Sequence, residues 1–387
     1  MSTDETAAGK HLSKTSLRNF GPPVPQRDRD YRQPAYTIAI PRDEAPIPVL
    51  LRYALTLVGI PHFGPGEKVE WWTTFTYRNY PCELAHQKFG VRLRIGGNLT
   101  EERALALLSE MRRKLSSAVK AVEKLLGQTA GDTLNAGNVT VINQHRKLRH
   151  AYDYFRVRAT TPDVVEDVHE TGSFDEGGSW STFLSGKEVM AMNAFHDLVA
   201  AITAYLSCLE HDLVLALPFL DFDSTNDNLT NIIGARWGEK WRRVVGHADP
   251  EAVQLHERLA AVVERWRNPY SHGGFEKGFS ATVYLHTPGL GALPVGLSSI
   301  RHSPMFSFHA ASDTDVEGVF ALFDEVDAFL HRKFPHAMEW IDSELAVQFD
   351  SAFRAKAAAC IQSAGRLQPL IDEHAYREEK IANMDYP

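Results

Sequence analysis

Arg267, Asn268 and His272 are the residues whose types and spacing point most directly to chemistry, and two glycines follow them. An arginine offers a planar fork of donors that suits a phosphate, and a histidine gains or loses a proton near neutral pH. Together they suit cleavage of a phosphodiester without a metal ion. His272 would move a proton at the ribose 2′-hydroxyl or at the leaving oxygen, and Arg267 would stabilise the developing negative charge. The spacing alone equally fits a helix end with an interfacial arginine and a histidine in a turn.

Pro269 decides how this motif is arranged. On an unbroken helix, a five-residue separation turns the side chains of Arg267 and His272 about 140° apart. The proline ring clashes with the carbonyl of Arg265, so we expect the helix to be disrupted there. A bend would bring Arg267 and His272 onto one surface, whereas a helix that ends at Asn268 would leave His272 in a loop.

The string Arg267-Asn268-x-x-x-His272 resembles the signature of the HEPN superfamily (higher eukaryotes and prokaryotes nucleotide-binding). In that signature an arginine, often followed by asparagine, precedes a histidine by four to six positions. The context is also similar: a long helix with an acidic residue at Glu210 comes first, a segment Arg236-Trp237-x-x-Lys240-Trp241 follows, and the motif comes last. The resemblance covers about residues 185–335, and residues 1–160 resemble no known family.

The resemblance implies a helical bundle that dimerises and sets two motifs across a shared cleft. It also implies an endoribonuclease of a defence or toxin–antitoxin system that needs no metal or other cofactor. Arg267 would then stabilise the transition state, His272 would be the acid and base, Asn268 would position the phosphate or the histidine, and Glu210 would orient the arginine. The expected partners are RNA, a second copy of the chain, and an antitoxin or regulatory protein. Many members have lost activity, so the alternative is a HEPN-like interaction or sensor protein that binds a nucleotide or a protein.

Two basic groups are further candidates for RNA contacts. The first consists of Arg236, Lys240, Arg242 and Arg243, interleaved with tryptophans, together with Arg265. It predicts a backbone track with stacking platforms, or a helix with its tryptophans in the core and its arginines outside. The second group lies between His145 and Arg158, and it suits RNA, docking on the acidic half of the chain, or a solvated helix face.

Charge and cysteine usage limit the class of protein. The 387 residues carry a net charge of −8, which divides into +9 for residues 1–160 and −17 for residues 161–387. Cys82, Cys208 and Cys360 are far apart and predict neither a disulfide framework nor a zinc or redox motif. The longest apolar stretches are interrupted by charged residues, so we expect a cytoplasmic protein without a membrane partner.

Periodicity predicts a mainly α fold with small β elements, an α+β class. Apolar spacing predicts helices from Thr100 to Gly127, from Lys187 to Leu217 and from Pro250 to Arg267. Alternation of β-branched and aromatic residues predicts strands between Val69 and Ile95. A capping box at Thr314–Glu317 predicts the start of a further helix.

The predicted organisation has five parts. It comprises a flexible N-terminal arm, a basic α+β domain with a β-hairpin and a helix, an acidic linker, a HEPN-like helical domain with a β insertion, and a C-terminal helical tail. Their boundaries are 1–47, 48–160, 161–181, 182–350 and 351–387.

Overall fold

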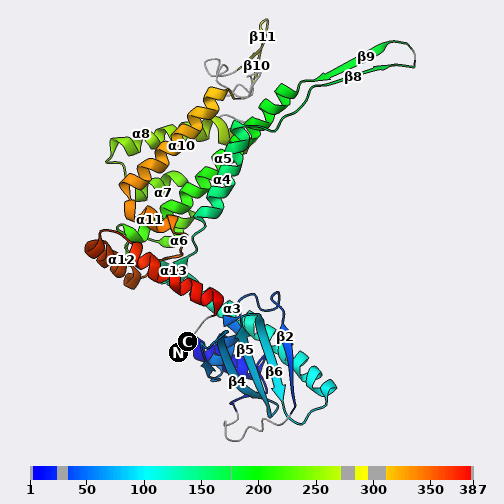
Figure 1. Ribbon diagram of the computed structural model, residues 1–387, viewed down its shortest axis with the longest axis vertical. Helices are drawn as coiled ribbons and strands as arrows, with labels where there is room; N and C mark the ends of the chain where they lie inside the picture. Colours follow the sequence, from blue (N-terminus) through cyan, green and yellow to red (C-terminus); the bar gives the residue numbers. More distant parts are fainter. Residues whose placement is uncertain (1–2, 24–33, 176, 272–283, 295–310, 385–387) are drawn as a thin grey trace. The chain divides into compact units, whose positions relative to one another are not determined.

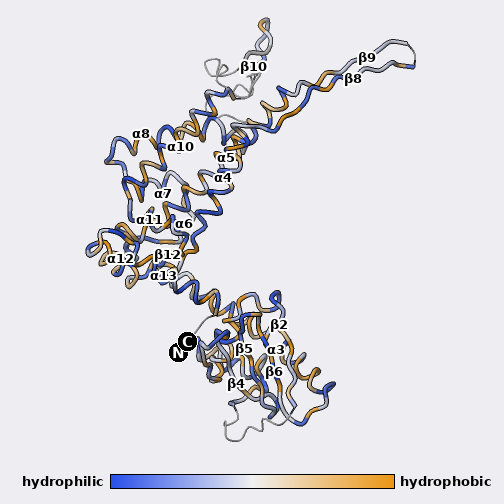
Figure 2. Tube along the Cα trace, in the orientation of Figure 1, coloured by the Kyte–Doolittle hydropathy of each residue, from blue (hydrophilic) through white to orange (hydrophobic). Residues whose placement is uncertain are grey.

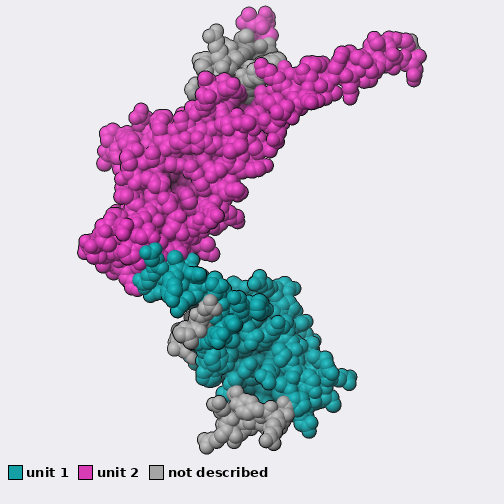
Figure 3. Space-filling view, in the orientation of Figure 1, with its two compact units in different colours: residues 1–134, 372–387 teal, residues 135–371 magenta. Residues whose placement is uncertain are grey.

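The chain has a mainly helical α+β fold with a six-stranded antiparallel sheet, which confirms the predicted class. The computed structural model describes residues 3–23, 34–175, 177–271, 284–294 and 311–384 (Figure 1). The chain divides into two compact units: residues 1–134 with 372–387, and residues 135–371 (Figure 3). Along the helices of each unit the hydropathy alternates (Figure 2), as expected for elements with one buried and one exposed face.

The sheet of the first unit is an antiparallel meander of β4 (Val69–Tyr77), β5 (Tyr80–Gln87) and β6 (Gly90–Gly96). The short strands β1 (Phe20–Gly21) and β3 (His62–Phe63) pair with β4, and β2 (Ala35–Ile40) pairs with β6. Trp71, Phe75 and Tyr77 on β4 are buried, as the alternation of the sequence predicts.

Arg78 and Asn79 connect β4 to β5 as a two-residue hairpin turn. Their φ angles are 48° and 70°, so both lie in the left-handed region that a type I′ turn requires. Arg78 donates to Glu110 at 2.7 Å. Arg78 and Asn79 are the same two residue types as Arg267 and Asn268, but here they form the turn of a hairpin.

Helix α3 (Glu101–Asn135) covers the core of the first unit, and the hydroxyl of Thr100 accepts a hydrogen bond from the Arg103 amide at its start, at 3.4 Å. The helix continues beyond Gly127, where the sequence predicted its end. Gly127 does not adopt the positive φ of a glycine that terminates a helix. A lone glycine costs a helix only about 1 kcal/mol, so the flanking helix formers outweigh it.

The N-terminal residues that the structure describes, 3–23 and 34–47, belong to the first unit and do not form the flexible arm expected over 1–47. They form helix α1 (Thr3–Lys14) and strand β2, and helix α2 (Val49–Leu57) follows them. Leu12 and Leu17 are each 1% exposed. Periodicity did not indicate these elements because they are short and prolines surround them.

The second unit is built around α5 (Gly186–Ala216), whose N-cap Ser185 accepts a hydrogen bond from the Glu188 amide. By length and composition α5 is apolar enough to cross a membrane, but most of its apolar window is buried in the bundle. The helices that surround it are α4 (His145–Thr160), α7 (Trp237–Val244), α8 (Pro250–Val262), α10 (Asp313–Lys333) and α11 (Pro335–Asp342). The capping box of α10 is made by Ser312 and Asp315, two residues before the predicted pair.

Helices α4 and α5 are antiparallel neighbours (Figure 1). Three side-chain contacts at successive levels fix this direction: Arg158 with Asp197, Tyr152 with Tyr205, and His145 with Asp212. Residues 135–160 therefore belong to the second unit, and the boundary between the units lies near residue 134.

The acidic segment 161–181, expected to be a linker, contributes to a hairpin of β8 (Val168–Ser173) and β9 (Ser179–Leu184). Gly172 lies opposite Trp180, and a Cβ atom at Gly172 would come within 2.5 Å of the indole ring. The absence of a side chain at Gly172 therefore admits the cross-strand tryptophan.

Two of the remaining regions bear on earlier predictions. A β hairpin of β10 (Tyr284–Thr287) and β11 (Gly291–Pro294) confirms the expected β insertion where the structure describes it. The C-terminal segment is helical, as predicted, but Phe353 and Leu370 are buried, so it packs against the protein. The other elements are the 3-10 turn Leu217–Phe219, α6 (Leu229–Gly234), α12 (Ser351–Ala364), α13 (Gln368–Asn383), and the pair β7 (Thr140–Val141) and β12 (Val347–Gln348).

Candidate functional site

The predicted motif begins at the end of α8, which continues through a π-helical turn at Val263–Arg267 into the short helix α9 (Asn268–Ser271). The Asn268 amide donates to the carbonyl of Val263, five residues earlier. A wider turn suits this position because Pro269 has no N–H to donate to the carbonyl four residues before it. The helical path is therefore widened near Pro269 and not broken. His272 lies outside the described residues.

Arg267 differs from the other arginines of this segment. Arg258 is paired with Glu325, and Arg265 pairs with Asp315 at 3.1 Å and stacks over the ring of Trp266. Within the described part of the chain, Arg267 forms no ion pair, and its buried Nε, like that of Arg265, has no hydrogen-bond partner. Buried polar groups are nearly always satisfied, so this guanidinium is suited to bind an anionic group.

Aromatic packing fixes the motif helix against the first half of α5. The ring of Phe195 lies 6.0 Å from that of Trp266 and 4.8 Å from that of Tyr270. Burial raises the pKa of Tyr270. The motif is thus held by apolar contacts that do not occupy the Arg267 guanidinium.

The structure does not bring Glu210 to Arg267. Glu210 lies fifteen residues beyond Phe195 on α5, a distance of about 22 Å at the rise of an α-helix. Its carboxylate accepts a hydrogen bond from the ammonium of Lys240 at 2.6 Å. Lys240 is only 5% exposed, so it stabilises α5 against α7 and is not a free cation for RNA.

The other basic candidates at α7 differ in whether they form ion pairs. Arg243 forms ion pairs with Asp227 at 2.6 Å and with Asp221 at 2.9 Å, and its hydrogen bond lowers the pKa of Asp227. Arg236 and Arg242 are exposed and form no ion pair within the described ranges. Trp241 is fully buried, so it offers no stacking surface to a base.

The basic group on α4 contacts acidic residues of its own unit. Arg156 forms a bidentate pair with Asp324 at 2.6 and 2.7 Å, and this pair lowers the pKa of Asp324. Arg149 pairs with Asp327, and Arg158 donates to Asp197 at 3.2 Å. Of the alternatives for this group, docking on the acidic residues of the second half agrees with the structure.

A second cluster of polar groups was missed by the sequence analysis. His145 Nδ1 lies 3.0 Å from both carboxylate oxygens of Asp212, and Cys208 Sγ lies 3.5 Å from Asp212 Oδ2 and 3.7 Å from His145 Nδ1. The hydrogen bond to Asp212 raises the pKa of His145, and burial raises the pKa of the Cys208 thiol. The only local signal was the spacing of four between Cys208 and Asp212, which places them on one helix face.

A cavity of about 360 Å³ opens beside this cluster, and His145 is one of its lining residues. The remainder of its lining is polar, and most of it is charged: Arg146, Arg149, His150, Asp153, Asp342 and Glu344. Asp342 also contacts His331 Nε2 at 3.2 Å. The cavity is therefore a polar site at the opposite end of α5 from the motif.

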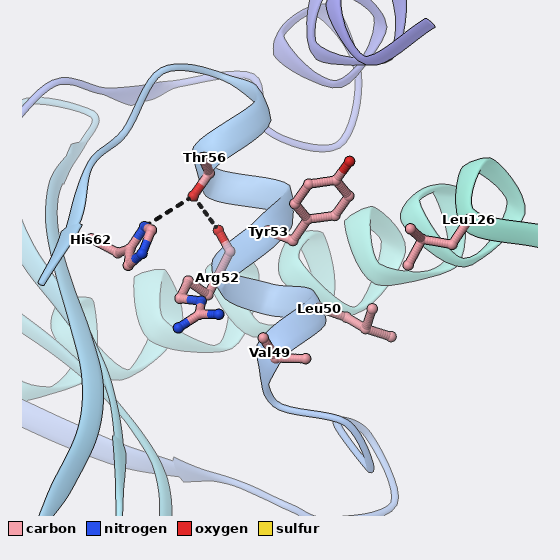
Figure 4. A pocket seen from close by; sticks show the side chains of 7 residues that line it. All are labelled: Val49, Leu50, Arg52, Tyr53, Thr56, His62 and Leu126. Atoms are coloured by element: carbon pink, nitrogen blue, oxygen red, sulfur yellow. Dashed lines mark hydrogen bonds between the residues drawn. The ribbon is translucent and has the colours of Figure 1, made fainter. Parts of the chain in front are cut away.

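The first unit has a smaller and more apolar pocket of about 260 Å³, lined by residues of α2, α3 and β3 (Figure 4). The hydroxyl of Thr56 donates to the Arg52 carbonyl at 3.0 Å and lies 3.4 Å from His62 Nδ1. Tyr53 donates to Glu5 at 2.8 Å, and burial together with this bond raises the pKa of Tyr53 to about 12. Because these polar groups already form hydrogen bonds within the protein, the pocket has fewer polar groups available to a ligand than either end of α5 has.

Comparisons with protein-family models, with curated proteins and with solved structures find no match to this chain.

Proposed function

We propose that the protein is a HEPN-like endoribonuclease in which Arg267, Asn268 and His272 cleave RNA without a metal ion. The observation that carries the proposal is that the Arg267 guanidinium forms no ion pair with any residue that the structure describes, whereas Arg258 and Arg265 pair with carboxylates. A guanidinium that forms no ion pair with a protein carboxylate can donate hydrogen bonds to a phosphate instead.

The reaction is a transesterification. His272 removes the proton of the ribose 2′-hydroxyl, the 2′-oxygen attacks the phosphorus, and the bond to the 5′-oxygen breaks with return of a proton to that oxygen. Arg267 stabilises the extra negative charge on the phosphoryl oxygens, and Asn268 positions the phosphate or the histidine. The products are a 2′,3′-cyclic phosphate and a free 5′-hydroxyl. If two motifs act across one cleft, the active form is a dimer, and an antitoxin or regulatory protein would control it.

RNA cleavage by the purified full chain in EDTA tests the proposal. We expect His272→Ala and Arg267→Ala each to lower the cleavage rate about 10²- to 10⁴-fold. Arg258→Ala is the matched control because it removes an arginine from the same helical segment that is already paired with Glu325. Equal cleavage by wild type and His272→Ala, or loss of cleavage in Arg258→Ala alone, would contradict the proposal.

A HEPN-like protein that binds without cleaving is the second candidate, and the position of Glu210 favours it. The carboxylate that the resemblance assigns to orienting Arg267 is bonded to Lys240 instead. Titration of an RNA oligonucleotide or a nucleotide by fluorescence anisotropy separates the two functions. Binding that depends on Arg267, with intact ligand after prolonged incubation, would favour the binding protein.

A further inference from the structure

The cluster of His145, Cys208 and Asp212 combines three different metal-ligating atoms at one point. The imidazole Nδ1, the thiol sulfur and a carboxylate oxygen all lie within 4.8 Å of one another. Nitrogen, sulfur and oxygen donors together suit a late first-row ion, with zinc the most common of these in proteins.

The distances between the donor atoms match those of a coordinated ion. Zinc bonds of about 2.0–2.3 Å at tetrahedral angles place nitrogen and oxygen donors roughly 3.3 Å apart, and place sulfur roughly 3.6 Å from either. The corresponding separations here are 3.0 Å for His145 to Asp212, 3.7 Å for His145 to Cys208 and 3.5 Å for Asp212 to Cys208. An ion can therefore enter with side-chain shifts of a few tenths of an ångström.

The burial of the ligands fits the charge of such an ion. Cys208 is 2% exposed and Asp212 is 8% exposed. A thiolate and a carboxylate together carry two negative charges, which a divalent cation neutralises in a site where unpaired charge is costly. Neutral imidazole supplies the third ligand without further charge.

The surrounding structure holds these ligands in place. Cys208 and Asp212 are one turn apart on α5, and His145 is the first residue of α4. Asn143 accepts a hydrogen bond from the His145 amide at 2.9 Å and donates to the carbonyl of Ile341 at 2.8 Å. The backbone that carries the histidine is thus fixed to α11, as expected for a preorganised ligand.

Three protein ligands leave the fourth tetrahedral position open, as in catalytic zinc sites. His145 lines the cavity of about 360 Å³, so one of the three ligands borders a space that admits water or a small ligand. Arg146 and Arg149 in the cavity lining suit an anionic ligand.

We propose that His145, Cys208 and Asp212 bind a zinc-type divalent ion whose open coordination position faces this cavity. The site is separate from the proposed nuclease motif. Asp212 is seventeen residues beyond Phe195, which is about 25 Å along α5. The proposed RNA cleavage does not require it.

Cobalt(II) titration of the tag-free, metal-free full chain tests this site. A thiolate ligand gives cobalt(II) an intense charge-transfer absorption band in the near ultraviolet, which histidine and carboxylate sites alone do not produce. We expect one cobalt ion per chain with this band, and displacement of the cobalt by added zinc. We expect Cys208→Ser to abolish the band and Cys360→Ser to retain it.

Asp212→Asn provides a second variant if Cys208→Ser fails to fold, and we expect it to weaken zinc binding about tenfold or more in a competition assay. Absence of the band in the wild type, its persistence in folded Cys208→Ser, or zinc binding unchanged in Asp212→Asn would overturn the proposal. The cobalt band reports thiolate coordination, whereas RNA cleavage in EDTA reports Arg267 and His272. Failure of one proposal is therefore distinguishable from failure of the other.

Discussion

The two ends of α5 hold two different kinds of site. Near its start, Phe195 packs against Trp266 and Tyr270, and the nearby Arg267 guanidinium is left without an ion pair in the described residues. Near its end, Cys208 and Asp212 contact His145, and each donor atom lies close to another donor. The first end leaves a cation available for an anion, and the second gathers nitrogen, sulfur and oxygen donors suited to a metal cation.

This difference shows how one helix can support two sites that do not share residues. Most of α5 between them is apolar and buried in the bundle. Close packing makes such a core stiff, so each site can keep its own geometry. Substitutions that act on one end only are the direct way to test this separation.

The largest effect is expected from Phe195→Ala. Loss of a fully buried aromatic ring costs about 3–5 kcal/mol of unfolding free energy, and here it also removes the support of the motif helix. We expect a lower melting temperature and strongly reduced RNA cleavage, with the cobalt band retained below the melting temperature. Met192→Ala is the control, since Met192 is exposed on the same helix. Loss of the cobalt band in folded Phe195→Ala would show that the two ends are not separate.

A smaller effect is expected from Lys240→Met. The change leaves Glu210 without its partner in a partly buried position, and the cost is about 2 kcal/mol because Glu210 keeps access to water. Urea unfolding measures this loss, and exposed Arg242→Met should change stability by less than about 0.5 kcal/mol. RNA cleavage by the folded Lys240→Met protein should be unchanged, because Glu210 is far from Arg267. A loss of RNA cleavage without a loss of stability would place Glu210 functionally at the motif.

The smallest effect is expected in the pH dependence of stability. It arises from His331 and Asp342, and Asp342 lines the cavity near the end of α5. The hydrogen bond to Asp342 raises the pKa of His331 from 6.5 to about 9. The folded state therefore binds this proton more tightly than the unfolded state. The stabilisation is fully present below pH 6.5 and is lost as the pH rises through 9. Because both side chains are about half exposed, water screens the pair and limits the effect to about 1 kcal/mol.

Chemical unfolding between pH 6 and 10 tests this effect. We expect His331→Gln to remove part of the decline in stability that the wild type shows toward alkaline pH. His150→Gln is the control, because His150 is exposed and forms no ion pair in the part of the chain that the structure describes. An identical decline in wild type and His331→Gln would contradict the assignment.

The elements of the bundle could be predicted because their signals are local. The apolar spacing and capping of α5 and α8 placed their ends within a few residues of the observed ones. The wider turn before Pro269 could not be predicted, because a missing N–H can be accommodated by a break, a bend or a π turn.

Contacts between residues that are far apart in the chain could not be predicted from the sequence. His145 and Asp212 are 67 residues apart, and no local spacing shows that α4 and α5 are antiparallel neighbours. The same limit applies to Lys240, a candidate for RNA contact in the sequence, which pairs with Glu210. A charge pattern shows the sign of the charge on a side chain, but it does not show which residue the side chain pairs with.

The division of the chain has a consequence for the order in which the protein is made. Residues 372–387 belong to the first unit, where the carbonyl of Met384 accepts a hydrogen bond from the Lys68 amide at 2.9 Å. During translation, this unit can complete its contacts only after the whole second unit has left the ribosome. The N-terminal unit therefore begins to fold first and is finished last.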